Sequence, residues 1–344
     1  LVAVACAAVA HGLRIPPTAV LERGASLSSA LEADKVSTSL ARVVSSMASC
    51  CARMSAEVAR APVVGSGGSA GGTNVQGEEQ KELDVIGNDV ITAALRSCGC
   101  VGVMASEEED EPVVLKEGGR FSVVFDPLDG SSNVEASIPT GTIFGVHDNA
   151  DTTDPLGSVL RRGDAQVAAG YALYGGATTL VLSWGRGAHE FVLHEGEFIL
   201  SKPHLALPPR GASYSLNEAR ELDWPEGLRT LISDLKRGRG PSSTPFKYRY
   251  ICSLVADFHY ALHRGGWAAN PRPHLRLLFE CAPMAFIAEQ AGGAATTGTE
   301  RVLGVAPAAV HQRVPFFAGS AGDVGDLVAH GDVVQSATGK GGRL

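Results

Sequence analysis

Phe125-Asp-Pro-Leu-Asp-Gly-Ser-Ser-Asn133 directly follows an apolar run that has the character of a buried strand. Pro127 fixes its own φ, so Asp126 and Asp129 can face the same ion with the Leu128 carbonyl between them. The segment therefore predicts a strand that ends in a metal-binding turn. A simple turn followed by a helix N-cap is the structural alternative for the same residues.

The second half of this segment has the composition of a phosphate-binding site. Gly130 lets the backbone come close to a ligand, and the N–H groups of Gly130, Ser131 and Ser132 at a helix start would hold a phosphate. Metals next to a phosphate pocket imply phosphoryl chemistry, in which ions polarise the phosphate and lower the pKa of an attacking water.

Further acidic residues fall at the ends of other expected elements. Glu107-Glu108-Glu109-Asp110 and Glu280 follow expected strands, and Glu78 and Asp84 flank or open an expected helix. If the strands share a sheet, these acids collect at one point, where like charges raise each other's pKa unless cations compensate them. Oxygen ligands without a His/Cys cluster favour Mg²⁺ or Mn²⁺ over zinc. Glu107–Asp110 alone would be interpreted as a solvated acidic loop.

The remaining pattern predicts an α/β protein. Helical spacing of apolar residues occurs at 36–58, 79–96, 225–236, 254–263 and 285–290, with a short helix after 319. Strand-like runs occur at 101–105, 121–125, 142–146, 167–174, 179–184, 190–193, 214–216, 275–279 and 316–319. A domain boundary is expected near 203–212, where prolines interrupt the pattern.

Composition excludes several classes of protein. The 344 residues are 44% hydrophobic and 19% charged, which excludes a disordered chain. The net charge is −8 without a long basic run, so neither nucleic acid nor a membrane surface is an expected partner. Seven cysteines at irregular spacing indicate buried thiols rather than a disulfide framework.

Blocks along the chain resemble the fructose-1,6-bisphosphatase family over about residues 36 to 330. Besides the segment at 125–133, these blocks are Gly72-Thr-Asn-Val-Gln-Gly-Glu78, Ala105-Ser-Glu-Glu108, Gly141-Thr-Ile-Phe-Gly145, Leu275-Arg-Leu-Leu-Phe-Glu280-Cys-Ala-Pro-Met284, Glu289-Gln-Ala-Gly-Gly293 and His311-Gln-Arg-Val-Pro315. The metal motif is shared with the wider lithium-sensitive sugar phosphatase superfamily, whereas the flanking blocks are specific to the bisphosphatase branch.

The resemblance implies a layered α-β-α-β-α sandwich of the sugar phosphatase type with two α/β subdomains. We expect an N-terminal α+β phosphatase domain at 36–205 and a C-terminal α/β domain at 206–332. Residues 1–35 would be a targeting remnant or a flexible N-terminus, and 333–344 a flexible tail.

The resemblance also implies a set of metal ligands and a water-activating pair. The expected ligands of two to three Mg²⁺ ions, with Mn²⁺ possible, are Glu78, Glu107, Asp126, the Leu128 carbonyl, Asp129 and Glu280. Asp84 and Glu108 would be the catalytic pair that activates water, and a coupled pair of this kind titrates as a unit.

For the substrate, the resemblance implies two phosphate sites. Asp129, Gly130, Ser131 and Ser132 would bind the 1-phosphate. The 6-phosphate and the sugar would be bound by Asn217, Arg220, Arg249, Tyr250, His274 and Arg276. Arg249 is expected to reach a neighbouring subunit of a homotetramer, with a homodimer as the minimum.

Three positions of the expected 6-phosphate and sugar site depart from the family pattern. Arg220 and Asn270 stand where tyrosines are expected, and His274 stands where a phosphate-binding lysine is expected. A neutral histidine loses a charge-assisted bond worth about 1.5–3 kcal/mol. These changes predict a raised KM for fructose 1,6-bisphosphate and a broader tolerance for other 1-phosphorylated sugars.

The expected activity is hydrolysis of the 1-phosphate of fructose 1,6-bisphosphate, as in gluconeogenesis, the Calvin cycle or sucrose synthesis. The alternatives are a sedoheptulose-1,7-bisphosphatase or broader sugar phosphatase, and a catalytically silent sugar-phosphate-binding scaffold. A chloroplast location is favoured, with the cytoplasm as the alternative.

Overall fold

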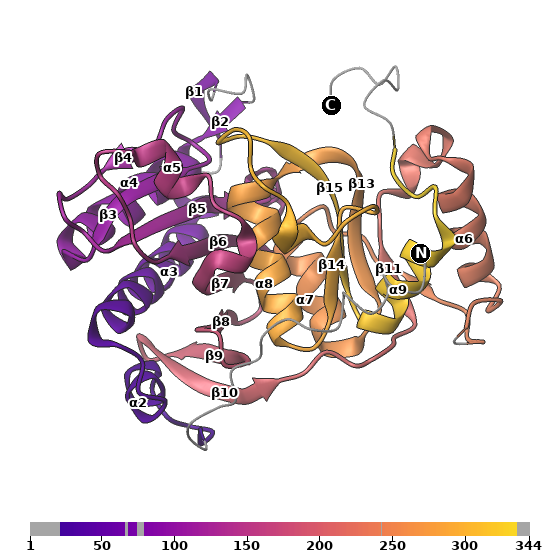
Figure 1. Ribbon diagram of the computed structural model, residues 1–344, viewed down its shortest axis with the longest axis horizontal. Helices are drawn as coiled ribbons and strands as arrows, with labels where there is room; N and C mark the ends of the chain where they lie inside the picture. The colour runs from indigo at the N-terminus through magenta and orange to yellow at the C-terminus, as the bar shows by residue number, and fades with distance from the viewer. Residues whose placement is uncertain (1–20, 66–67, 74–78, 242, 336–344) are drawn as a thin grey trace.

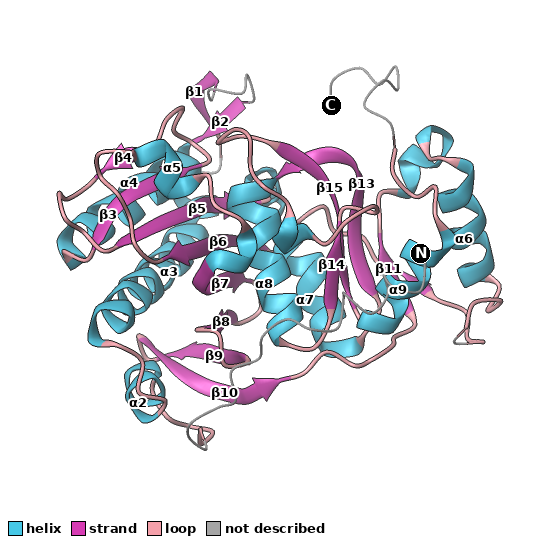
Figure 2. Cartoon of the chain, viewed as in Figure 1, coloured by secondary structure: helices cyan, strands magenta, loops and turns pink. Residues whose placement is uncertain are grey.

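The chain forms a layered α/β sandwich with two main β-sheets (Figures 1 and 2). The computed structural model describes residues 21–65, 68–73, 79–241 and 243–335. In Figure 1, helices α3 and α4 lie on the outer side of the larger sheet, α7 and α8 lie between the sheets, and α6 and α9 lie beyond the second sheet. The predicted α-β-α-β-α sandwich is therefore confirmed.

The larger sheet has eight strands in the order β10-β9-β8-β7-β6-β5-β3-β4. Their bounds are β3 Val101–Ser106, β4 Val113–Val114, β5 Phe121–Asp129, β6 Thr140–His147, β7 Gln166–Tyr174, β8 Thr178–Ser183, β9 Ala188–His194 and β10 Glu197–Leu205. Strands β3 and β5 are parallel, so their carboxyl ends lie side by side. The Glu107 N–H donates to the Phe125 carbonyl at 3.1 Å, which brings the two acidic segments together as predicted.

The second sheet has five strands in the order β12-β11-β13-β15-β14. Their bounds are β11 Ser213–Ser215, β12 Lys247–Tyr248, β13 Trp267–Arg276, β14 Ala294–Thr296 and β15 Arg313–Gly319. A separate two-stranded ribbon consists of β1 Ser69–Thr73 and β2 Glu79–Lys81.

The helices of the described chain are mostly amphipathic or buried. They are α2 Leu27–Ala33, α3 Thr38–Val64, α4 Glu82–Cys98, α5 Pro155–Val159, α6 Glu226–Lys236, α7 Leu254–Arg264, α8 Ala282–Gln290 and α9 Ala321–His330. Short helical turns are η1 Ser131–Ala136, η2 Gly163–Ala165, η3 Glu218–Asp223, η4 Leu277–Cys281 and η5 Val302–Gly304. Within the described ranges, no helix has the length and apolar character needed to cross a membrane.

The described residues form four apolar cores, and three of them join the main layers. The first joins α3 and α4 to the larger sheet through side chains such as Met47, Ile91 and Phe125. The second fills the space around α7 and α8, with Phe258 at its centre. The third packs α6 and α9 on the second sheet around Trp267. Burial of these faces is the main force that fixes the order of the layers.

The strand predicted at 275–279 is wrong. Strand β13 ends at Arg276, and the chain then enters the wide helical turn η4, which leads directly into α8. The Arg276 N–H donates to the Glu280 carboxylate at 2.6 Å, so a helical turn stabilised by its own acidic residue replaces the end of the strand. The run Leu277–Phe279 is apolar because both neighbouring layers bury it, which gives no alternation to separate helix from strand.

Two other segments differ from the sequence-based expectation. Within the expected N-terminal segment 1–35, helix α2 is folded and buries Leu27, Ala30 and Leu31. Between α3 and α4, outside any expected strand, Ser69–Thr73 pairs with Glu79–Lys81. Strands β10 and β14 were not predicted. In β10 only Phe198 and Leu200 are buried and Pro203 interrupts the apolar pattern, and β14 has only three residues.

Gly87 lets helix α4 lie directly on the metal-binding turn that was predicted at 126–129. A Cβ at Gly87 would lie 3.0 Å from Cβ of Pro127 and 3.1 Å from Cε of Met54. We predict that Gly87→Val destabilises the protein by about 1–3 kcal/mol, because the added methyl groups push α4 away from Pro127. Chemical denaturation measures this change.

Gly325→Val on α9 is the matched control, because no heavy atom lies within 4 Å of the added Cβ. It should change the stability by no more than about 0.5 kcal/mol. Equal losses in both variants would contradict the argument.

Candidate active site

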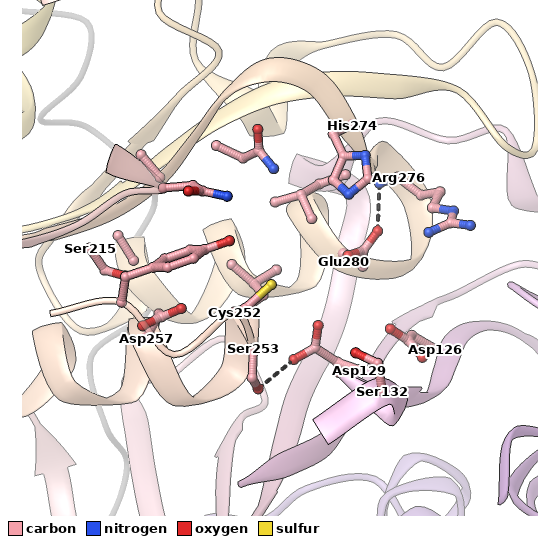
Figure 3. A pocket seen from close by; sticks show the side chains of 18 of the residues that line it. Asp126, Asp129, Ser132, Ser215, Cys252, Ser253, Asp257, His274, Arg276 and Glu280 are labelled. Carbon is pink, nitrogen blue, oxygen red and sulfur yellow. Dashed lines mark hydrogen bonds between the residues drawn. The ribbon is translucent and has the colours of Figure 1, made fainter. Parts of the chain in front are cut away.

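A cavity of about 760 Å³ brings most of the predicted site residues together. Its lining includes Asp84, Glu107, Glu108, Asp126, Leu128, Asp129, Gly130, Ser131, Ser132, Asn217, Arg220, Tyr250, Asn270, His274, Arg276 and Glu280. Figure 3 shows Asp126, Asp129 and Glu280 on one side of the cavity, with Arg276 beside Glu280, and Asp257 on the other side. The predicted residues come from both halves of the chain.

Two predicted site residues are not in this group. Arg249 is exposed, and its guanidinium lies 4.4 Å from the ring centre of Tyr260 at a second cavity of about 320 Å³. Glu78, a predicted metal ligand, lies outside the described residues.

Three buried carboxylates form the centre of the acidic end. Asp126, Asp129 and Glu280 are each no more than 8% exposed, and one oxygen from each lies within 4.8 Å of the others. Burial is the main cause that raises the pKa of Asp126 and of Glu280 well above the ordinary range, and the charge of Glu107 raises both further. The raised pKa values show that these carboxylates ionise readily only when a positive charge is nearby. Carboxylate oxygens are the ligands that hard divalent cations prefer.

Pro127 explains how Asp126 and Asp129 reach the same cavity. In a regular strand, residues three apart point to opposite faces. Here the pairing of β5 with β6 is irregular between Asp126 and Asp129, because Pro127 has no N–H to donate to the ladder. The Leu128 N–H donates instead to Oδ1 of Asp126 at 2.9 Å, which fixes this irregularity. The predicted turn at 126–129 is therefore an irregular part of β5, which continues to Asp129 instead of ending at 125. The predicted convergence of the two aspartates on one cavity is therefore observed.

Helix α7 orients Asp129 from the other half of the chain. Oδ2 of Asp129 accepts hydrogen bonds from Ser253 Oγ and from the Val255 N–H, both at 3.0 Å (Figure 3). Gly130 makes this close approach possible, because its φ is +74° and a Cβ there would lie 3.1 Å from Cβ of Ser253. Sequence analysis missed Ser253, whose role depends on a contact 124 residues away.

Arg276 places one positive charge among the acids. Its guanidinium lies 2.7 Å from Oε1 of Glu107, and both side chains are largely buried. Its backbone N–H holds Glu280, as described above. Arg276 thus positions two of the predicted metal ligands, in addition to lining the cavity.

Asp84 and Glu108 lie next to the central carboxylates. Asp84 is the third residue of α4 and accepts a hydrogen bond from the Lys81 N–H at 3.1 Å. Burial, followed by the negative charge of Glu108, raises the pKa of Asp84 to about 7. A carboxylate with a pKa near 7 can accept a proton from a water molecule at neutral pH.

A second group of lining residues carries positive charge. Arg220 and Arg272 belong to it and lie close to Asn217 and Tyr250, and Arg220 also forms an ion pair with Asp223 at 3.4 Å. Burial lowers the pKa of Arg272, and the nearby charge of Arg220 lowers it further. Two neighbouring guanidiniums are suited to bind an anion.

Sequence analysis missed Arg272. It lies in strand β13 between Pro271 and Pro273. The two prolines, which keep the chain extended, were the available signal that its side chain would be held in place.

A five-layer α/β sandwich with oxygen-rich acids at one end of a cavity and guanidiniums at the other is typical of metal-dependent sugar phosphatases. The model of the fructose-1-6-bisphosphatase N-terminal domain matches residues 20–203, and that of the C-terminal domain matches residues 207–331. The chain belongs to the fructose-1,6-bisphosphatase family, which confirms the resemblance.

Similar proteins come from distant organisms. The chain is 43% identical over 318 residues to a chloroplastic fructose-1,6-bisphosphatase of Brassica napus, covering 85% of this chain and 77% of that protein. It is 43% identical over 282 residues to a class 1 fructose-1,6-bisphosphatase of Chlorobium chlorochromatii, covering 78% and 84%. The crystal structure of Leishmania major fructose-1,6-bisphosphatase in holo form has a TM-score of 0.84 at 35% identity, covering 90% of this chain and 98% of that one.

We predict that Asp84 lowers the stability of the metal-free protein progressively as the pH rises from about 4 to about 7. Asp84 has a pKa of about 7 in the folded chain and an ordinary value of 3.8, so the folded state binds more protons than the unfolded state between these two values. Raising the pH through this window therefore removes the stability that the protonated carboxyl contributes. The largely buried histidines with pKa values of about 4 have the opposite effect, because their ordinary value of 6.5 lets the unfolded state bind more protons, so the contribution of Asp84 is measured against Asp84→Asn.

Thermal denaturation of both proteins in the presence of a chelator measures this effect. The denaturation temperature of the unsubstituted protein minus that of Asp84→Asn should fall from about pH 4 to about pH 7. A difference that rises over this window would contradict the assignment.

Proposed function

We propose that this chain hydrolyses the 1-phosphate of fructose 1,6-bisphosphate to give fructose 6-phosphate and phosphate. One observation carries the proposal: a single cavity holds an acidic end built for cations and a cationic end built for an anion. A substrate with a phosphate at each end fits this polarity. The family to which the chain belongs supports the same activity.

The proposed ions are two to three Mg²⁺, with Mn²⁺ as an alternative. Their ligands would be Glu107, Asp126, the Leu128 carbonyl, Asp129 and Glu280, with Glu78 as a further ligand. The donor set supports this choice, because the clustered groups are buried oxygen donors. When bound, such ions polarise a phosphate ester and lower the pKa of an attacking water.

The chain's own residues would perform the remaining steps. Gly130, Ser131 and Ser132 line the cavity beside Asp129 and would bind the 1-phosphate. Asp84 and Glu108 would orient the attacking water and take its proton on a carboxylate oxygen, since Asp84 has a pKa of about 7. Burial of the acidic end excludes bulk water and strengthens each of these interactions.

Arg220 and Arg272 would bind the 6-phosphate, with Asn217, Tyr250 and His274 around the sugar. The sequence alone predicted that 6-phosphate binding is weakened at His274. Arg272 supplies a second guanidinium close to Arg220, which supports a 6-phosphate site in which two arginines replace the missing lysine. No feature of the cavity favours the seven-carbon substrate or a silent scaffold.

We also propose a homotetramer in a plastid. Exposed Arg249 lies beside Tyr248 and Ile251, which are 46% and 39% exposed, and such a surface is suited to a neighbouring subunit. Several of the similar proteins are chloroplastic, which supports the location.

Phosphate release from a panel of sugar phosphates tests the activity. We expect Mg²⁺-dependent release from fructose 1,6-bisphosphate, slower release from sedoheptulose 1,7-bisphosphate and none from fructose 6-phosphate. Asp126→Asn should reduce kcat by at least about 10³-fold, because it removes a charged ligand at the reacting phosphate. Absence of release from every bisphosphate with Mg²⁺ present would refute the proposal.

The cationic end can be tested separately. Arg272→Ala should raise KM for fructose 1,6-bisphosphate roughly ten- to a hundredfold and leave kcat nearly unchanged, because the lost contact is remote from the reacting phosphate. KM for fructose 1-phosphate, which has no second phosphate, should not change. His274→Lys should lower KM for the bisphosphate with kcat unchanged.

Arg239→Ala, at an exposed surface site, is the control for a general effect of losing an arginine. An equal rise of KM for fructose 1-phosphate and for the bisphosphate in Arg272→Ala would contradict the assignment.

A further inference from the structure

Glu190, His259 and His263 form a compact cluster outside the cavity described above. One possible ligand atom from each residue lies within 4.8 Å of the others. Glu190 belongs to β9 of the larger sheet, and both histidines belong to the second half of α7. The cluster therefore joins the eight-stranded sheet to the helix layer in the middle of the molecule.

The donor set differs in kind from that of the acidic cavity. His259 and His263 are four residues apart on one helix, which places both imidazoles on the same face. Two histidines at this spacing with one carboxylate are a common zinc-binding set, whereas Mg²⁺ prefers oxygen ligands only.

Neighbouring side chains orient the donors. The Tyr171 hydroxyl lies 2.8 Å from Nδ1 of His259, which leaves Nε2 as the free ligand atom of that ring. Ser201 Oγ donates to Oε1 of Glu190 at 2.8 Å and leaves Oε2 facing the histidines. Metal-ligating His and Glu side chains are usually oriented by hydrogen bonds of this kind, made by the nitrogen or oxygen that does not bind the metal.

Glu190 and His263 are in direct contact. Oε2 of Glu190 lies 2.7 Å from Nε2 of His263, and the Glu190 side chain is 6% exposed. A metal ion bound to both atoms would take the place of the proton between them. His263 is 20% exposed, which gives an ion access from solvent.

Lys202 is the competitor for this position. Its ammonium lies 3.1 Å from Oε1 of Glu190 and 3.4 Å from Nδ1 of His263. The Lys202 side chain is 52% exposed, so it can swing into water when a cation arrives.

We propose that Glu190, His259 and His263 form a second metal site, selective for zinc-class divalent ions, with a water as the fourth ligand. Zinc–ligand bonds of about 2.0–2.2 Å require only small changes in the distances between the three ligand atoms. Occupancy fixes the end of α7 to β9, while the start of the same helix holds Asp129.

Titration with Co²⁺ in the presence of saturating Mg²⁺ tests the site. Four-coordinate Co²⁺ bound through imidazole absorbs visible light far more strongly than octahedral Co²⁺ on oxygen ligands. We expect one strongly absorbing equivalent per chain in the unsubstituted protein and in Asp126→Asn, and loss of this band in His263→Ala. A band that persists in His263→Ala, or no band in the unsubstituted protein, overturns the proposal.

Zinc affinity, measured by equilibrium dialysis with Mg²⁺ present, gives a second readout. Glu190→Gln should weaken binding at least tenfold, and Tyr171→Phe roughly tenfold through the lost support of His259. Lys202→Met should strengthen binding several-fold, because it removes the competing ammonium. A purely structural ion pair predicts no zinc binding and no gain in Lys202→Met, and either result overturns the site.

His194→Ala is the matched control, because this exposed histidine of β9 lies at the far end of the same strand. It should bind zinc as the unsubstituted protein does. Thermal denaturation in the presence of a chelator establishes that each variant is folded before its affinity is compared.

Discussion

The cost of burying negative charge governs the structure around the cavity. Asp84, Glu107, Asp126, Asp129 and Glu280 are each no more than 9% exposed. Each carboxylate raises the free energy of ionising its neighbours, as the raised pKa values of Asp84, Asp126 and Glu280 record. A cluster of buried carboxylates does not stabilise a fold by itself, so its presence indicates that bound cations offset the free energy of burying these charges.

Holding these charges in place requires both halves of the chain. Strands β3 and β5 bring Glu107 and Asp126 together because they are parallel neighbours. Helix α7 then holds Asp129 through Ser253 and Val255. Asp257, also in the first turn of α7, accepts a hydrogen bond from the Ile251 N–H at 3.0 Å, which fixes the loop beside the cavity. The substrate-facing loop and the metal ligand thus depend on one helix.

The sequence predicts best what local chemistry determines. The irregular backbone at 126–129 was predicted because Pro127 interrupts the strand within the same four residues. The α/β class followed from the periodicity, and the layered sandwich followed from the family resemblance. Glu280 was placed at the right edge of the sheet although its element was wrong, because a helical turn and a strand end both leave it beside Arg276. Ser253, Asp257 and Arg272 could not be found in this way, since their roles depend on which distant segments the fold brings to the cavity.

Each end of the cavity holds like charges that repel one another, and each is stabilised by a ligand of opposite charge. The acidic end repels an anionic substrate until its charge is compensated, and the guanidiniums of Arg220 and Arg272 repel each other until an anion lies between them. In a chain of net charge −8, positive potential must be concentrated locally to attract a bisphosphate. Cations that compensate the acids lower the free-energy cost of placing the first phosphate at the acidic end. The second phosphate then relieves the repulsion between the two arginines. Cation binding and substrate binding should therefore favour one another, as the reciprocity of linked equilibria requires.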